Sequence, residues 1–176
     1  MSTFQNDKND KNDKNNKNDN YFMSNNDNVN NVKMIDTSRT GLNKKVLYRE
    51  AKAKATIKLT KEIINKIINN EIPKGNVLVI SKTAGILAAK NTANLIPLCH
   101  PLNPEFMDIN FKINEDTIEI EAIVKGEAKT GFEMEALTAA TITALTIYDL
   151  CKPLFDKILI TDIHLIYKTK KDLQKS

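Results

Sequence analysis

The sequence lacks the features of membrane-spanning, secreted and disulfide-stabilised proteins. Its 176 residues include two cysteines, Cys99 and Cys151, too few for a disulfide framework or a zinc site. No apolar run reaches the roughly 18 residues of a transmembrane helix. The N-terminus has no apolar segment typical of a secretory signal, and its many aspartates are atypical of a mitochondrial transit peptide. We therefore expect a cytoplasmic protein with no membrane partner.

Aromatic residues and strong net charge are also scarce, which bears on nucleic-acid binding. Tryptophan is absent and aromatic residues make up 6% of the chain, so few side chains can stack on bases. The 26 Lys and Arg residues against 22 Asp and Glu residues give a formal net charge of +4, which suits an anionic small molecule as well as nucleic acid. Neither the phosphate-binding Gly-x-x-x-x-Gly-Lys-Ser/Thr loop nor the dinucleotide-binding Gly-x-Gly-x-x-Gly pattern occurs. The residues favour an anionic ligand and no nucleic-acid partner. The main alternative to an enzyme acting on such a ligand is a nucleotide- or RNA-binding module, and a purely structural partner of another enzyme is the third possibility.

Two regions of the chain differ in composition. Residues 5–31 are mostly Asn, Asp and Lys, with Asn-Asp-Lys repeated three times over residues 6–14. Such a segment cannot bury enough apolar area to offset its conformational entropy. We therefore expect a disordered tail over residues 1–31 and one folded domain over residues 32–176.

Hydrophobic periodicity within the domain predicts an α+β fold. Alternating residues predict strands at 47–59, 107–113, 117–125 and 158–168, the middle two forming a hairpin. Helical spacing predicts helices from Thr60 to about Asn70, at 83–95 and at 132–151, whereas the apolar run 77–80 fits a helix or a strand. This order favours a mostly antiparallel sheet with helices packed on one face.

One candidate site is the loop around His100. Prolines at 97 and 101 restrict the backbone there, and a histidine on a stiff loop suits proton transfer or phosphate binding. The alternative is a loop histidine that bonds to a backbone carbonyl. Neighbouring Cys99 is either a nucleophile or a small apolar group.

Two carboxylates lie at the start of the long helix. Thr130 and Glu133 have the spacing of a capping box, so spacing alone gives Glu133 a capping role. Glu135 lies near the helix start, where it could point at a ligand, although spacing alone makes it structural as well.

A third cluster lies at the opposite end of this helix. Asp149 and Lys152 share a helical face, as an acid–base pair or as a weak surface ion pair. Lys74 belongs to a Pro-Lys-Gly turn and Lys90 to a helix turn facing the His100 loop, and several such lysines would suit a polyphosphate. Glu135 and Asp149 are 14 residues apart, roughly 21 Å along a helix, so one small headgroup cannot reach both in one subunit. Either the ligand is long or subunits share sites, and the second option predicts an oligomer.

These clusters resemble the molybdenum-cofactor biosynthesis protein C (MoaC) family of cyclic pyranopterin monophosphate synthases. The resemblance covers nearly all of residues 32–168 and excludes the tail. The matching stretches are residues 34–38, 73–77, 83–90, 95–102, 129–138 and 144–152.

The resemblance implies a ferredoxin-like domain whose dimers assemble into a homohexamer, with active sites at subunit interfaces. It implies a lyase that converts 3′,8-cyclised dihydro-GTP into cyclic pyranopterin monophosphate and releases pyrophosphate. No cofactor is then required. Mg²⁺ could accompany the triphosphate, although no carboxylate cluster marks a metal site.

The resemblance also implies residue roles. It makes Asp149, Lys152 and Lys74 catalytic. The implied substrate-binding residues are Leu98, Cys99, His100, Met134 and Glu135, joined by Glu133, Lys90, Arg49 and Lys168, and Asp36 also matches a family position. After Lys168 the family commonly continues Ser-Gly-Gly-Lys-Ser-Gly, whereas this chain has Thr-Lys-Lys-Asp-Leu over residues 169–173, which loses the glycines and keeps the positive charge. Asn76 and Asn91 also depart from the family, which usually has Asp and Arg there.

Overall fold

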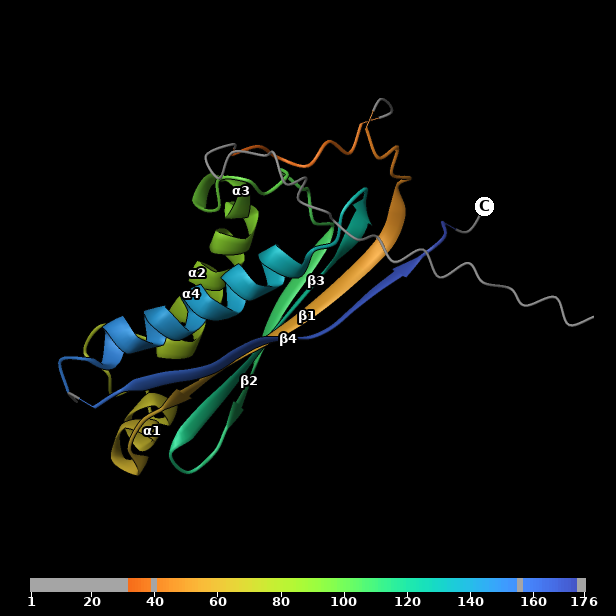
Figure 1. Ribbon diagram of the computed structural model, residues 1–176. Coiled ribbons are helices and arrows are strands. Elements are labelled where there is room, and N and C mark those ends of the chain that lie inside the picture. The colour runs from red at the N-terminus through yellow and green to blue at the C-terminus, as the bar shows by residue number, and fades with distance from the viewer. Residues whose placement is uncertain (1–31, 39–40, 155–156, 174–176) are drawn as a thin grey trace, which may run out of the picture. The chain divides into compact units, whose positions relative to one another are not determined.

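A four-stranded antiparallel sheet organises the protein (Figure 1). The computed structural model describes residues 32–38, 41–154 and 157–173. The strands β1 (Leu47–Lys58), β2 (Phe106–Ile113), β3 (Thr117–Ala128) and β4 (Leu159–Lys171) lie in the order β2-β3-β1-β4. This order, with helical crossovers after β1 and β3, is the ferredoxin-like arrangement that the resemblance implies. The predicted tail at residues 1–31 lies outside the described residues, so the domain boundary stays a prediction.

The two faces of the sheet follow from the alternation of β1. Ala51, Ala53, Ala55 and Ile57 are fully buried and face the helices. The opposite face of the sheet carries lysines and carboxylates that pair between β1 and β3. These ion pairs include Lys52 with Glu121 at 2.5 Å, Lys54 with Glu119 at 3.0 Å and Lys125 with Glu50 at 3.3 Å. Alternation therefore predicts the sheet correctly, and small alanines let the helices pack closely.

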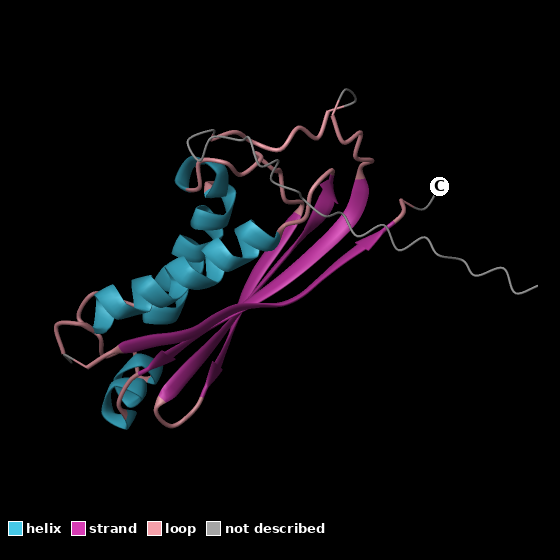
Figure 2. Cartoon of the chain, viewed as in Figure 1, coloured by secondary structure: helices cyan, strands magenta, loops and turns pink. Residues whose placement is uncertain are grey.

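The helices lie on one side of the sheet, as Figure 2 shows. They are α1 (Lys61–Ile68), α2 (Val77–Lys90), α3 (Thr92–Leu95) and α4 (Glu133–Cys151). Thr60 caps α1 as predicted. The predicted helix 83–95 is wrong in its bounds, because Asn76 caps an earlier start by accepting a hydrogen bond from Val79 N at 3.0 Å. At the other end the Asn91 N–H bonds to the last carbonyls of α2, so α3 is a separate turn.

Close packing between α2 and α4 depends on Gly85. A Cβ at this position would meet Thr143 Oγ1 and would lie 2.5 Å from Ile109 Cδ1 and 2.9 Å from the Ala139 carbonyl oxygen. We expect Gly85→Ala to lower the free energy of unfolding by about 1–3 kcal/mol, since overpacking outweighs the gain in helix propensity. Urea denaturation would measure this, with exposed Thr83→Ala as a control expected to stay within about 0.5 kcal/mol. Equal stability of both variants would contradict this packing.

Candidate active site

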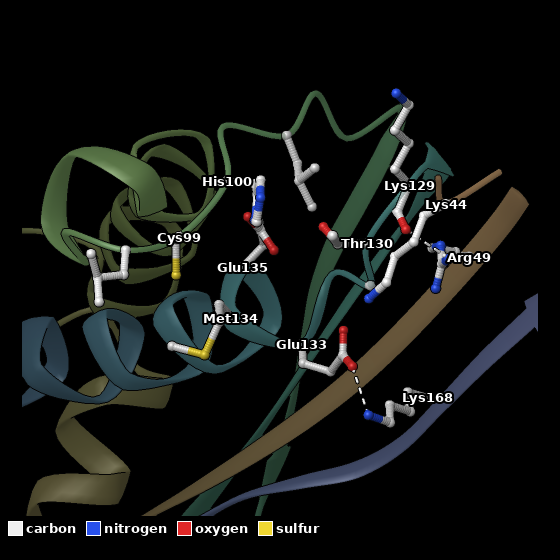
Figure 3. Close-up of a pocket in the computed structure, with 13 residues that line it drawn as sticks. Lys44, Arg49, Cys99, His100, Lys129, Thr130, Glu133, Met134, Glu135 and Lys168 are labelled. Atoms are coloured by element: carbon white, nitrogen blue, oxygen red, sulfur yellow. Dashed lines mark hydrogen bonds and ion pairs between the residues drawn. The ribbon is translucent and has the colours of Figure 1, made fainter. Parts of the chain in front are cut away.

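A cavity of about 470 Å³ opens beside the N-terminal end of α4 (Figure 3). The loop after α3 contributes to one part of its lining and the ends of β1, β3 and β4 to another. Its lining residues are Lys44, Arg49, Leu98, Cys99, His100, Leu102, Lys129, Thr130, Gly131, Glu133, Met134, Glu135 and Lys168. Eight of the substrate-binding residues predicted from the resemblance are thus brought together, from segments up to 119 positions apart (49 to 168).

The loop after α3 presents His100 and Cys99 to the cavity. His100 Nε2 lies 2.8 Å from the backbone oxygen of Ile35, so this nitrogen donates the hydrogen bond and Nδ1 is left as an acceptor in the neutral ring. Burial, with a smaller contribution from the Glu135 charge, raises the pKa of the Cys99 thiol. A neutral thiol is a poor nucleophile, which favours the apolar alternative for Cys99.

Glu135 is the buried acid of the cavity. Its side chain lies in the first turn of α4, the residue is 3% exposed, and its Oε2 has no hydrogen-bond partner among the described residues. Burial raises the pKa of this carboxyl to about 7, and the Glu133 charge acts in the same direction. Near neutral pH Glu135 therefore exists both as an acid that can donate a proton and as a carboxylate that can accept one.

Burial of Glu135 makes stability depend on pH. The pKa of Glu135 is about 7 in the folded state, against an ordinary value of 4.5 for an exposed glutamate. The folded state therefore binds more protons between these two pH values, and stability falls as pH rises through them. Glutamine at position 135 cannot ionise. We therefore expect Glu135→Gln to lack the wild-type decrease in the free energy of unfolding between pH 4 and pH 8, which is at most roughly 3 kcal/mol. Urea unfolding at several pH values measures this.

Glu133 supplies a control, because its ionisation changes stability with pH in the opposite direction. Although burial opposes ionisation of Glu133, the hydrogen bond from Lys168 and nearby positive charges lower its pKa. Ionised Glu133 stabilises the folded state above its unfolded pKa, and this stabilisation is lost as pH falls. Glu133→Gln therefore removes an increase in stability with rising pH, whereas Glu135→Gln removes a decrease. Parallel pH profiles of wild type and Glu135→Gln would contradict the buried-acid assignment.

The predicted capping role of Glu133 is wrong. Phe132 precedes α4 without a side-chain capping bond, and Glu133 Oε1 instead accepts a hydrogen bond from Lys168 Nζ at 2.9 Å. The partner comes from β4, 35 residues along the chain, which a local spacing rule does not consider. The two carboxylates at the start of α4 therefore differ, one ionised by its lysine and the other largely protonated below neutral pH.

Positive side chains surround the strand side of the cavity. Arg49 is fixed there, because its Nε and Nη2 donate to the carbonyls of Ala128 and Lys129 at 2.9 Å each. Lys44, Lys129 and Lys168 add three further cations. Lys44 and Lys129 are cavity residues that the sequence patterns do not point to. The only local signals for them are the lysine pair before β1 and the position of Lys129 beside the Thr-Gly turn. Such a set of cations suits a polyphosphate.

Asp149, Lys152 and Lys74 form a second cluster, at the other end of α4. Asp149 Oδ1 lies 2.8 Å from Lys152 Nζ, and its Oδ2 accepts from Lys74 Nζ at 3.0 Å. Lys74 also donates to the Asp149 backbone oxygen at 2.9 Å. The hydrogen bonds from Lys152 and then Lys74 lower the pKa of Asp149, and Asp149 in turn raises the pKa of Lys152. Asp149 thus starts as a proton acceptor and Lys152 as a proton donor.

Several predicted residues lie away from the cavity. The second cluster lies about 21 Å along α4 from Glu135, as the sequence spacing requires. Lys90 is exposed at the end of α2 and does not line the cavity. Asp36 accepts a hydrogen bond from Ser38 N at 2.8 Å and is also absent from the lining.

The described part of the chain holds neither a cluster of metal ligands nor a helix that could span a membrane. Within residues 32–38, 41–154 and 157–173, no three His, Cys, Asp or Glu side chains gather as a metal site would require. No helix in these ranges is long and apolar enough to cross a bilayer.

Comparison with known proteins gives consistent matches. The model of the MoaC family matches residues 34–171. A cyclic pyranopterin monophosphate synthase of Peptoclostridium acidaminophilum is 48% identical over 121 residues, which are 69% of this chain and 77% of that protein. One of Heliobacterium modesticaldum is 43% identical over 139 residues, 78% of this chain and 85% of that protein. The molybdenum cofactor biosynthesis protein moc-5 of Caenorhabditis elegans is 42% identical over 151 residues, 85% of this chain and 24% of that protein.

Proposed function

The chain belongs to the MoaC family, and on that premise we propose that it is a cyclic pyranopterin monophosphate synthase of molybdenum cofactor biosynthesis. Its substrate is a pterin precursor, the 3′,8-cyclised dihydro-GTP, and its products are cyclic pyranopterin monophosphate and pyrophosphate. The observation that carries the proposal is the cavity, in which four cations lie beside one ionised carboxylate and one carboxyl group whose pKa is about 7.

The residue types fit the two parts of this reaction. Rearranging a purine into a pterin needs repeated proton transfers, for which Glu135, Asp149 and Lys152 offer donors and acceptors near neutral pH. Closing a cyclic phosphate against pyrophosphate places negative charge on the departing oxygens, which cations stabilise. His100 and Glu135 hold the nucleotide, and Lys74 transfers protons or stabilises phosphate. The reaction is redox-neutral and therefore needs no redox cofactor, and we propose that side chains of this protein carry out the proton transfers.

We further propose that two copies of the chain complete each site. Glu135 and Asp149 lie at opposite ends of α4, too far apart for one nucleotide headgroup. The helix layer also carries exposed apolar side chains, with Val79 61%, Leu87 61% and Leu145 51% exposed, which is typical of a surface that meets another chain. Packing of a second copy would bring its Asp149 cluster toward the first copy's cavity, as in the homohexamer of dimers with interface sites that the resemblance implies.

The test is turnover by the purified protein. Cyclised dihydro-GTP is supplied, pyrophosphate is measured, and the product is oxidised to a fluorescent pterin. Release of both products in equal amounts supports the proposal. A folded oligomer that releases neither product contradicts it. RNA binding that weakens steeply with salt would then favour the RNA-binding alternative.

A further inference from the structure

A second, smaller cavity of about 250 Å³ adjoins the first. Four residues line both cavities, namely Arg49, Gly131, Glu133 and Lys168. The smaller cavity adds Thr169 and Lys170 from the end of β4. The shared residues make the two cavities neighbouring parts of one surface, so a long ligand can extend from one into the other.

The course of β4 explains how Lys170 reaches this cavity. The strand continues to Lys171, and its register pairs Ala51 with Lys168, Arg49 with Lys170 and Tyr48 with Lys171. Side chains alternate along a strand, so Lys168 and Lys170 lie on the same face as Arg49 and the fully buried Ala51. Lys171 lies on the opposite face, consistent with its electrostatic effect on Glu50. A regular strand thus occupies the place where the sequence departs from the glycine-rich pattern.

The charges of the smaller cavity suit a small, highly charged anion. Arg49, Lys168 and Lys170 contribute three cations, and Glu133 contributes one carboxylate that Lys168 already pairs. Thr169 belongs to the same lining. Arg49 is held in place by two backbone carbonyls, which reduces the entropy lost when it binds an anion.

Building on the proposed function, we infer that this cavity holds the pyrophosphate part of the substrate and that Lys170 is one of its binding residues. A substrate hydroxyl oxygen forms a bond to the α-phosphorus and gives its proton to a base. The bond from the α-phosphorus to the bridging oxygen breaks, and that oxygen leaves with the electron pair on pyrophosphate. The three cations stabilise this leaving group where its charge develops.

The test measures binding of inorganic pyrophosphate by calorimetry at fixed ionic strength. The full-length wild type is compared with Lys170→Gln and with Lys171→Gln, a control that removes the same charge from the opposite face of the same strand. We expect Lys170→Gln to weaken binding roughly tenfold, the effect of one charge-assisted hydrogen bond, and Lys171→Gln to change it less than twofold. Equal effects of the two variants would overturn the assignment of Lys170.

Turnover separates this inference from the proposed function. A wild type that turns over cyclised dihydro-GTP, with the two lysine variants equal in pyrophosphate affinity, overturns the inference and leaves the function in place. A wild type without turnover that binds pyrophosphate through Lys170 supports the anion site and overturns the function. In an active enzyme the inference also predicts a higher KM for Lys170→Gln than for Lys171→Gln.

Discussion

Asp149→Asn is expected to fold, to assemble and to lose about 10²- to 10⁴-fold in kcat, the range for loss of a general acid or base. Asparagine keeps the shape of the side chain but cannot accept the proton. It also removes the charge that two lysines contact at 2.8 and 3.0 Å. Because Asp149 raises the pKa of Lys152, the substitution also changes the proton donor of the cluster. Steady-state pyrophosphate release measures the loss.

Asp116→Asn is the matched control for this variant. Asp116 is an exposed aspartate paired with Lys58 at 3.7 Å, outside both clusters, so the same chemical change there should leave kcat unchanged. A wild-type kcat in Asp149→Asn would show that Asp149 takes no part in the chemistry. Circular dichroism and sedimentation of both variants show whether fold and assembly are retained.

The fold was predictable wherever a local pattern decides it. Alternation along β1 predicts which alanines are buried, and the Thr60 cap predicts the start of α1. The start of α2 was missed because four apolar residues, Val77 to Ile80, fit either a helix or a strand. The Asn76 side chain decides between them by capping Val79 N.

The site was less predictable, because its contacts join distant parts of the chain. Lys74 bonds to Asp149, which lies 75 residues further along the chain, and only the family resemblance assigns a catalytic role to both. Glu133 bonds to Lys168 rather than capping its helix. The burial that raises the pKa of Glu135 likewise depends on how the chain packs around the start of α4.

The most direct test of the account is activity in oligomers that mix two inactive variants. His100→Ala removes a cavity residue and Asp149→Asn removes the distant acid, so each variant alone should be nearly inactive. If each site takes its cavity from one copy and its Asp149 from another, random mixing leaves about a quarter of the sites intact. Co-expression in equal amounts is therefore predicted to restore about a quarter of wild-type turnover of cyclised dihydro-GTP. Activity no greater than that of the separate variants would contradict a site shared between the two ends of α4.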